Sequence, residues 1–183
     1  MALVIKGSSS GQITVDVPAS AGTNTLTLPA STGEITVGNN TPFCSVTMSA
    51  TVTVSNNVTT KVPLDTVVHQ SGVSFDTTNN KFVVPSGAGG TYFINAHLSG
   101  GTTDVTTLRT ISTLVYVNGS QYGKKGVINL NNAFGQVATV PYTTIVNLSV
   151  GDEVEMYGNV NRMTTTAQFR SSETELTIYK LIT

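Results

Sequence analysis

The side chains that most often carry out catalysis are scarce in this chain. His69 and His97 are the only histidines, and Cys44 is the only cysteine. Each histidine lies beside apolar residues on an expected strand, where a neighbouring polar group usually satisfies the ring. A catalytic triad can assemble from distant positions, so the spacing alone leaves one open. A structural role is the favoured interpretation, and we predict no catalytic residues; for Cys44 we expect a buried free thiol.

One acidic run is a candidate metal site. Asp152, Glu153 and Glu155 are the densest acidic residues, and on a strand Glu153 and Glu155 project to the same face. Carboxylates of this kind can bind calcium, but a solvated strand edge that discourages aggregation is the favoured alternative. The glycine-rich residues 87–90 are followed by neither a lysine nor an expected helix, so they do not predict a phosphate site. We therefore predict no metal and no cofactor.

Glycan hydrolysis needs two carboxyl groups about 5–10 Å apart. The chain has 10 Asp and Glu residues, and any two of them can meet in a folded protein. It has no tryptophan, the residue that usually lines the clefts of glycosidases. A glycan depolymerase is therefore a less favoured alternative to a protein without enzymatic activity.

One loop places cations beside an aromatic ring. Lys124 and Lys125 are the only adjacent basic residues, and Tyr122 precedes them. Such a loop can bind a glycan or an anionic polymer, while a solubilising hairpin tip is the simpler alternative. Tyr122, Lys124 and Lys125 are the candidate binding residues that the sequence offers.

The composition limits the possible partners. Of the 183 residues only 10% are charged, and the net charge is −1. A nucleic-acid-binding protein needs a basic surface, so we predict no nucleic-acid partner. No apolar run approaches the ~18 residues of a membrane span, and residues 1–10 lack the apolar segment of a signal peptide. We predict no membrane insertion.

The hydrophobic pattern repeats every second residue, which is typical of strands rather than helices. Residues 45–55 alternate apolar residues with Ser and Thr, which predicts one continuous strand with a single apolar face. Residues 92–98 predict a long central strand, with Tyr92 and Ile94 on one face and Phe93 on the other. Further short strands are expected at residues 13–17, 26–28, 35–37, 81–84, 114–117, 143–148, 154–157 and 175–182. Gly- and Asn-rich turns between them, including residues 79–80, 87–90, 100–101 and 151–152, indicate an all-β sandwich or barrel.

A change in composition divides the chain near residue 42. Residues 1–41, the arm, are rich in Ser, Thr, Ala and Gly and repeat Pro-Ala-Ser at residues 18–20 and 29–31. Strands this short cannot bury a face alone, so the arm is expected to pair with other chains or a partner surface. A flexible terminal arm is the alternative. Residues 42–183, the head, carry longer strands and are expected to contain the core.

Short motifs follow one another in a recognisable order from residue 60 to residue 182. The main ones are residues 62–68, 72–76, 80–85, 90–94, 114–119, 150–154 and 176–181. In order and spacing they resemble the jelly-roll heads of the complement-globular-head and tumour-necrosis-factor-like superfamily. The resemblance implies a two-sheet jelly-roll sandwich that associates as a homotrimer and binds rather than catalyses. Tyr92, Phe93 and Ile94 are the predicted core and trimer-forming strand.

The resemblance to this superfamily is incomplete. No Gly-X-Y repeat precedes the head, and the loops at residues 102–110 and 129–135 have no counterpart. No ligand residue of the relatives is therefore carried over to this chain.

The arm has a resemblance of its own. Residues 3–11, 17–19 and 25–30 are similar to the start of bacteriophage tail-fibre and related virion proteins. This implies an N-terminus that docks to the particle, followed by an outward-facing trimeric head.

Together these patterns predict a non-enzymatic phage structural protein. The leading hypothesis is a homotrimeric tail fibre, assembled in the host cytoplasm and located in the virion. Residues 1–41 are expected to contact other virion proteins, and the head is expected to bind a host-surface glycan. A capsid decoration or cement trimer is the alternative within the same class. A signalling ligand of the tumour-necrosis type is a further alternative, which the missing signal peptide disfavours.

Overall fold

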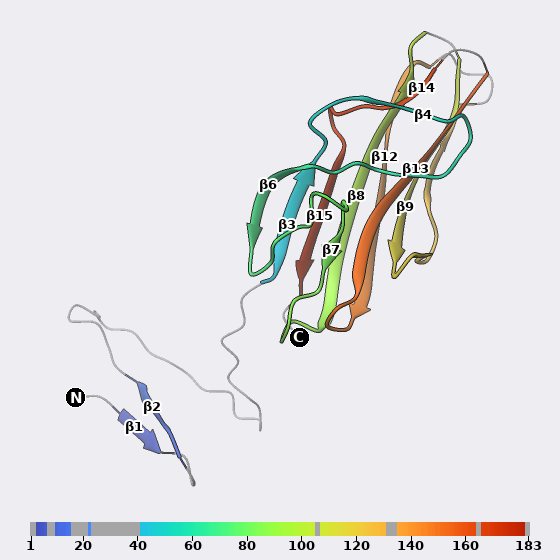
Figure 1. Ribbon diagram of the computed structural model, residues 1–183. Helices are drawn as coiled ribbons and strands as arrows, with labels where there is room; N and C mark the ends of the chain where they lie inside the picture. Colours follow the sequence, from blue (N-terminus) through green and yellow to red (C-terminus); the bar gives the residue numbers. More distant parts are fainter. Residues whose placement is uncertain are drawn as a thin grey trace. The chain divides into compact units, whose positions relative to one another are not determined.

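The computed structural model describes residues 3–6, 10–15, 22, 41–104, 107–130, 135–163 and 166–181. The chain divides into two compact units, Met1–Val37 and Gly38–Thr183. In the first unit, β1 (Leu3–Lys6) and β2 (Gln12–Val15) pair antiparallel, as Figure 1 shows in blue. The strands predicted at residues 26–28 and 35–37, and both Pro-Ala-Ser repeats, lie outside the described residues.

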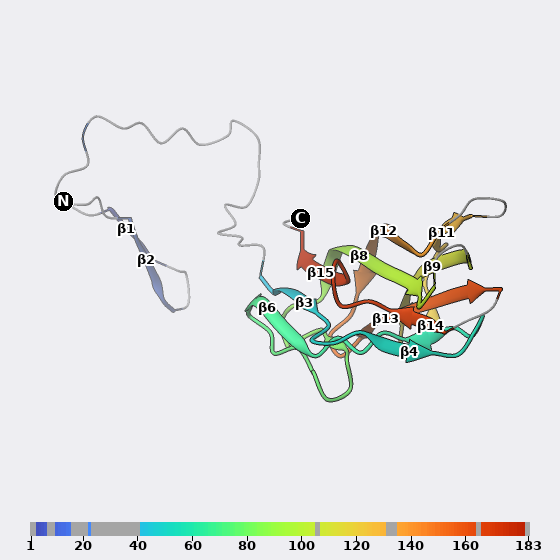
Figure 2. The same cartoon turned by 90° about the horizontal axis from the view of Figure 1, so that it is seen from above.

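Two antiparallel sheets build the second unit, which contains the head (Figure 1, Figure 2). The smaller sheet has the order β10 (Ser120–Gln121), β9 (Leu108–Val117), β13 (Glu153–Arg162), β5 (Thr60–Lys61), with β11 (Gly126–Asn129) on β9 and β7 (Phe82–Val83) on β13. The larger sheet has the order β4 (Val52–Val54), β14 (Ala167–Phe169), β8 (Gly90–Thr102), β15 (Glu175–Lys180), β3 (Phe43–Thr47), β6 (Thr66–Ser71), with β12 (Val137–Leu148) on β8. The described residues form no helix, and hence none long and apolar enough to cross a membrane. The predicted all-β jelly-roll sandwich is confirmed.

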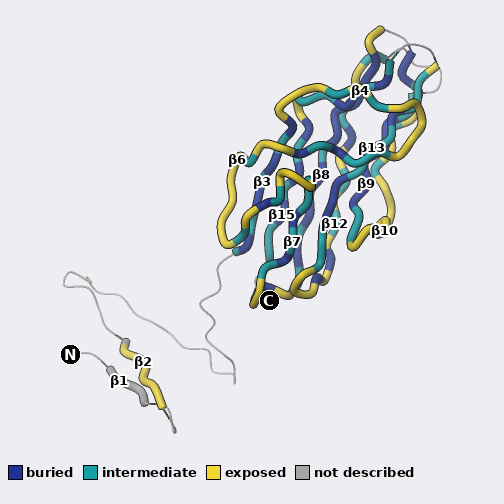
Figure 3. Tube along the Cα trace, in the orientation of Figure 1, coloured by how far each residue is buried: buried dark blue, intermediate teal, exposed yellow. Residues whose placement is uncertain are grey.

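The core lies between the two sheets. Tyr92, Ile94 and Leu98 of β8 are fully buried, while Phe93 lies on the opposite face, so the predicted alternation of this strand is confirmed. The rings of Phe82 and Tyr92 meet edge to face with centroids 5.8 Å apart, a favoured geometry for aromatic pairs. The Tyr92 hydroxyl donates to the Ala88 carbonyl oxygen at 2.6 Å. Figure 3 shows buried residues along the strands of both sheets and exposed residues at the turns.

Residues 45–55 do not form one strand, so that prediction is wrong. β3 ends at Thr47 and pairs with β15 and β6, whereas β4 pairs with β14. Between them the Ser49 amide and hydroxyl donate to the Asp65 carboxylate at 2.7 and 2.5 Å. A side chain thus takes hydrogen bonds that a neighbouring strand would otherwise make. As a result Ala50 is exposed, although the alternation placed it on the buried face.

β8 is longer than predicted because Gly100 and Gly101 continue the strand instead of forming a turn. A Cβ atom on Gly100 would lie 3.0 Å from side-chain atoms of Ile111 and Val160. A Cβ atom on Gly101 would lie 2.6 Å from the Gln136 carbonyl oxygen. These glycines permit close approach of neighbouring chain segments, which is a second reason for glycine inside a strand.

Two of the predicted turns are confirmed. Asp76 and Lys81 exchange backbone hydrogen bonds of 3.0 and 3.1 Å around residues 79–80, where Asn80 has a φ of +50°. Gly151, with a φ of +86°, stands in the turn that leads into β13. Asn and Gly tolerate this left-handed backbone better than other residues do.

Cys44 is a buried free thiol, as predicted. It is fully enclosed by the core, and burial raises its pKa to about 12. Since the thiolate is the reactive form, we expect no reaction with a disulfide reagent such as DTNB at pH 8 while the head is folded. Stoichiometric reaction should appear once urea unfolds it, and fast labelling of the native protein would contradict this burial.

Candidate functional site

An apolar row crosses the outer face of the larger sheet. It consists of Ile145, Phe93, Tyr179 and Phe43, which oppose one another in register across β12, β8, β15 and β3. Ile145 is 57% exposed, and the rings of Phe93 and Tyr179 stack with centroids 5.0 Å apart. The row lies outside the core because each member alternates with a core residue on its strand.

Polar side chains lie in the next register position along the same face. Thr143 donates to the Asn95 side-chain oxygen at 2.9 Å. The hydroxyls of Ser45 and Thr177 donate to the Glu175 carboxylate at 2.6 and 3.0 Å. These groups satisfy one another within the sheet, so they can lose water at lower cost than free polar groups. An apolar centre beside satisfied polar groups is the arrangement found in protein interfaces.

A pocket opens at the Phe43 end of the apolar row. Its volume is about 450 Å³, and the residues that line it are Phe43, Cys44, Ser45, His69, Thr177 and Tyr179. Ile145 stands at the other end of the same row, on β12. The face therefore presents an exposed aliphatic side chain at one edge and a hollow with aromatic walls towards the other.

The two histidines are not brought together. His69 lies on β6 opposite Ser45, and His97 lies on β8 opposite Glu175, with β15 and β3 between the two strands. Among the described residues, no group of three or more His, Cys, Asp or Glu side chains is placed to hold a metal ion.

The candidate basic loop divides into a structural and an exposed part. Tyr122 is half-buried against the core, and its amide donates to the Val115 carbonyl oxygen at 2.9 Å. Lys124 and Lys125 are exposed between β10 and β11. A binding role for these three residues remains a prediction.

The acidic run does not form a solvated strand edge, so that interpretation is wrong. β13 is an interior strand of the smaller sheet, and Glu155 is only 8% exposed. Glu155 forms an ion pair with Lys61, and Glu153 forms one with Lys81. Lys61 of β5 and Lys81, which directly precedes β7, thus neutralise these two carboxylates.

A stacked tyrosine pair lies beside these ion pairs on the smaller sheet. The rings of Tyr116 and Tyr157 are 4.0 Å apart between centroids, at 29° between planes. Burial raises the pKa of Tyr157, and the negative charge of Glu155 adds to the increase. Leu114, which opposes Tyr157 in register across β9 and β13, is buried.

No family model matches the chain, and no curated protein matches its sequence. Solved structures do match the fold. The globular domain of zebrafish complement 1qA protein aligns with a TM-score of 0.53 at 13% identity, over 77% of this chain and 98% of that one. Murine APRIL aligns with a TM-score of 0.53 at 15% identity, over 76% and 98% of the two chains.

The Eiger TNF from S. frugiperda aligns with a TM-score of 0.53 at 11% identity, over 79% of this chain and 94% of that one. The fold is that of the complement and tumour-necrosis-factor jelly rolls. The predicted resemblance of residues 60–182 is thereby confirmed for the fold. At such low identities the similarity extends to the architecture alone.

Sequence reasoning missed most of the apolar row. Tyr92 and Ile94 lie in the core as predicted, and Phe93 lies in the row. Ile145, Tyr179 and Phe43 were within or beside predicted strands, but nothing in the sequence indicated their register. The only sequence feature that could have indicated these residues is that each is large and apolar and lies on the strand face opposite the core-facing residues.

Proposed function

We propose that the head assembles as a homotrimer through the outer face of the larger sheet. The apolar row carries this proposal, because an exposed Ile145 beside stacked aromatic rings gains free energy when a partner covers it. The family resemblance, which implies a trimer, supports the same arrangement. Binding rather than catalysis is the function that such an assembly serves.

The two ends of the row suggest how the ring closes. Ile145 and the pocket beside Phe43 are different surfaces, so their contact is head-to-tail rather than isologous. Head-to-tail contacts form a closed ring when a whole number of copies, each rotated by the same angle, completes 360°. In the proposed trimer, the Ile145 edge of each copy packs towards the aromatic end of the next.

We further propose that this trimer is a phage virion protein, with a tail fibre as the leading role. The similarity of residues 2–38 to the start of tail-fibre proteins supports it, and the arm then docks to other virion proteins. The head binds a host-surface glycan, and three copies strengthen a weak single site.

Sedimentation equilibrium of the purified chain tests the assembly. The expected mass is about 57 kDa, three times the 19.1 kDa of one chain. A mass of one chain at micromolar concentration overturns the trimer.

Two assays on the phage that carries the protein separate the possible roles. A tail-fibre head supplied free should block adsorption to the host. A capsid decoration trimer should instead raise the heat resistance of capsids that lack it. Release of new sugar ends from host polysaccharide would show a depolymerase and contradict the binding-only role.

A further inference from the structure

The arginines of this chain gather at one end of the head. Arg109 stands near the start of β9, Arg162 ends β13, and Arg170 follows β14. β14 pairs with the Thr102 end of β8, and the Arg170 guanidinium donates to the Thr102 carbonyl oxygen at 2.9 Å. We call this the distal end, because the head begins near the other end of β8. Phe43, close to the start of the head, opposes Tyr179, and Tyr179 opposes Phe93 near that other end.

Among the described residues, no carboxylate forms an ion pair with these arginines. All acidic residues of the head fall within the described part of the chain, and its ion pairs there are made by Lys61 and Lys81. Of the acids nearest the distal end, Glu173 accepts a hydrogen bond from Thr139 at 2.6 Å, and Asp104 is exposed between β8 and β9. The distal end therefore carries three arginines and two exposed carboxylates, and none of the arginines forms an ion pair with a described residue.

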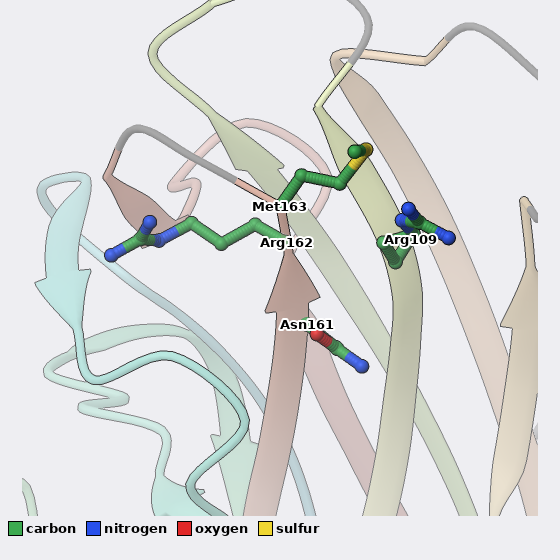
Figure 4. A pocket seen from close by; sticks show the side chains of 4 residues that line it. All are labelled: Arg109, Asn161, Arg162 and Met163. Atoms are coloured by element: carbon green, nitrogen blue, oxygen red, sulfur yellow. The ribbon is translucent and has the colours of Figure 1, made fainter.

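A pocket of about 400 Å³ lies at this end, lined by Arg109, Asn161, Arg162 and Met163. Figure 4 shows Asn161 directed towards the strand of Arg109, with Met163 above them and the Arg162 side chain extending the other way. The register agrees, since Asn161 opposes Thr110 and Arg162 opposes Leu108 on either side of Arg109. Arg109 and Asn161 thus offer hydrogen-bond donors from adjacent strands.

Of the remaining two residues, Met163 adds an apolar contact. The Nε of Arg162 is buried without a hydrogen-bond partner among the described residues, but its side chain extends away from Arg109 and Asn161 (Figure 4), so its guanidinium adds no donor beside theirs. Met163 is 59% exposed and presents an apolar side chain beside the donors. A guanidinium fork matches the two oxygens of a carboxylate or sulfate, and the methionine suits the carbon face of a ring.

We propose that the distal pocket binds an acidic sugar, with its oxyanion on Arg109 and Asn161 and its ring against Met163. This site names the class of glycan that the head would recognise in the proposed attachment role. It rests on that proposed function only for its biological use. It belongs to a single copy of the head, and a trimer repeats it three times at the end away from the arm's attachment.

NMR titration of the ¹⁵N-labelled full chain tests the site with sodium glucuronate, inorganic sulfate and glucose. We expect saturable shifts of the Arg109 Nε–H and Asn161 side-chain amide signals with glucuronate, weaker ones with sulfate and none with glucose. Arg109→Gln should weaken glucuronate binding at least about tenfold, because a charge-assisted hydrogen bond is lost. Arg109→Lys should restore part of it, since the charge returns without the fork.

Lys180→Gln is the matched control, since it removes a cation that lies opposite Tyr92 at the other end of β8 and should leave binding unchanged. Equal weakening by this control, equal binding of sulfate and glucuronate, or binding that survives Arg109→Gln would each overturn the proposal. Circular dichroism of each variant reports whether the fold is kept. Failure of the titration in a chain that sediments as a trimer removes the site and leaves the assembly standing.

Discussion

Ile145→Asp is expected to convert the homotrimer into folded monomers. Ile145 is 57% exposed on β12 and stands at one end of the apolar row. In the proposed assembly the new carboxylate would lose water without gaining a partner, and burying an unpaired charge costs several kcal/mol per site. The change repeats in every copy, so the sedimentation mass should fall to the 19.1 kDa of one chain at micromolar concentration.

Val127→Asp is the control for this substitution. Val127 is 49% exposed and β-branched like Ile145, but it lies on β11 of the smaller sheet. Its replacement should leave the trimer intact. The far-UV circular dichroism spectra of both variants should match the β-strand spectrum of the native protein. A trimer that survives Ile145→Asp would place the contact on another face.

Gly158→Val is expected to lower the free energy of unfolding of the head strongly. Gly158 lies in the middle of β13, between β9 and β5. A Cβ atom there would lie 2.4 Å from a methyl carbon of Leu98 and 2.9 Å from the Phe169 ring, both fully buried. Overpacking of a dense core costs about 1–3 kcal/mol and sometimes more, a large part of the ~5–15 kcal/mol that stabilises a typical domain.

Gly89→Ala provides the comparison. A Cβ atom on Gly89 would find its nearest neighbour, the Leu148 carbonyl oxygen, at 3.5 Å, an ordinary contact. Urea titrations followed by tyrosine fluorescence should show a large loss of unfolding free energy for Gly158→Val and a change within about 0.5 kcal/mol for Gly89→Ala. A smaller Gly158→Ala step should fall between them. Equal stability of all variants would contradict the close packing of the two sheets at this point.

Predictions from local sequence patterns were wrong where contacts with residues far away in the sequence determined the structure. The alternation across residues 45–55 is real, yet Asp65 captures Ser49 and separates β3 from β4. Gly100 and Gly101 have the composition of a turn, yet they continue β8 because β9, β13 and the segment before β12 approach them closely. Glu155 has the character of a surface acid, yet Lys61 makes an interior position tolerable. Each exception depends on a residue that no local window contains.

By itself, the sequence determined the strand class of this protein, several of its turns and the two faces of β8, since a period of two and the backbone preferences of Asn and Gly act between near neighbours. Only the tertiary structure decided what those faces present. Ile145 meets Phe93 and Phe43 meets Tyr179 through strand register, and Arg109 comes beside Asn161 in the same way. Register is set by packing across the whole sheet, so the apolar row and the distal pocket appear only once every strand has its partner.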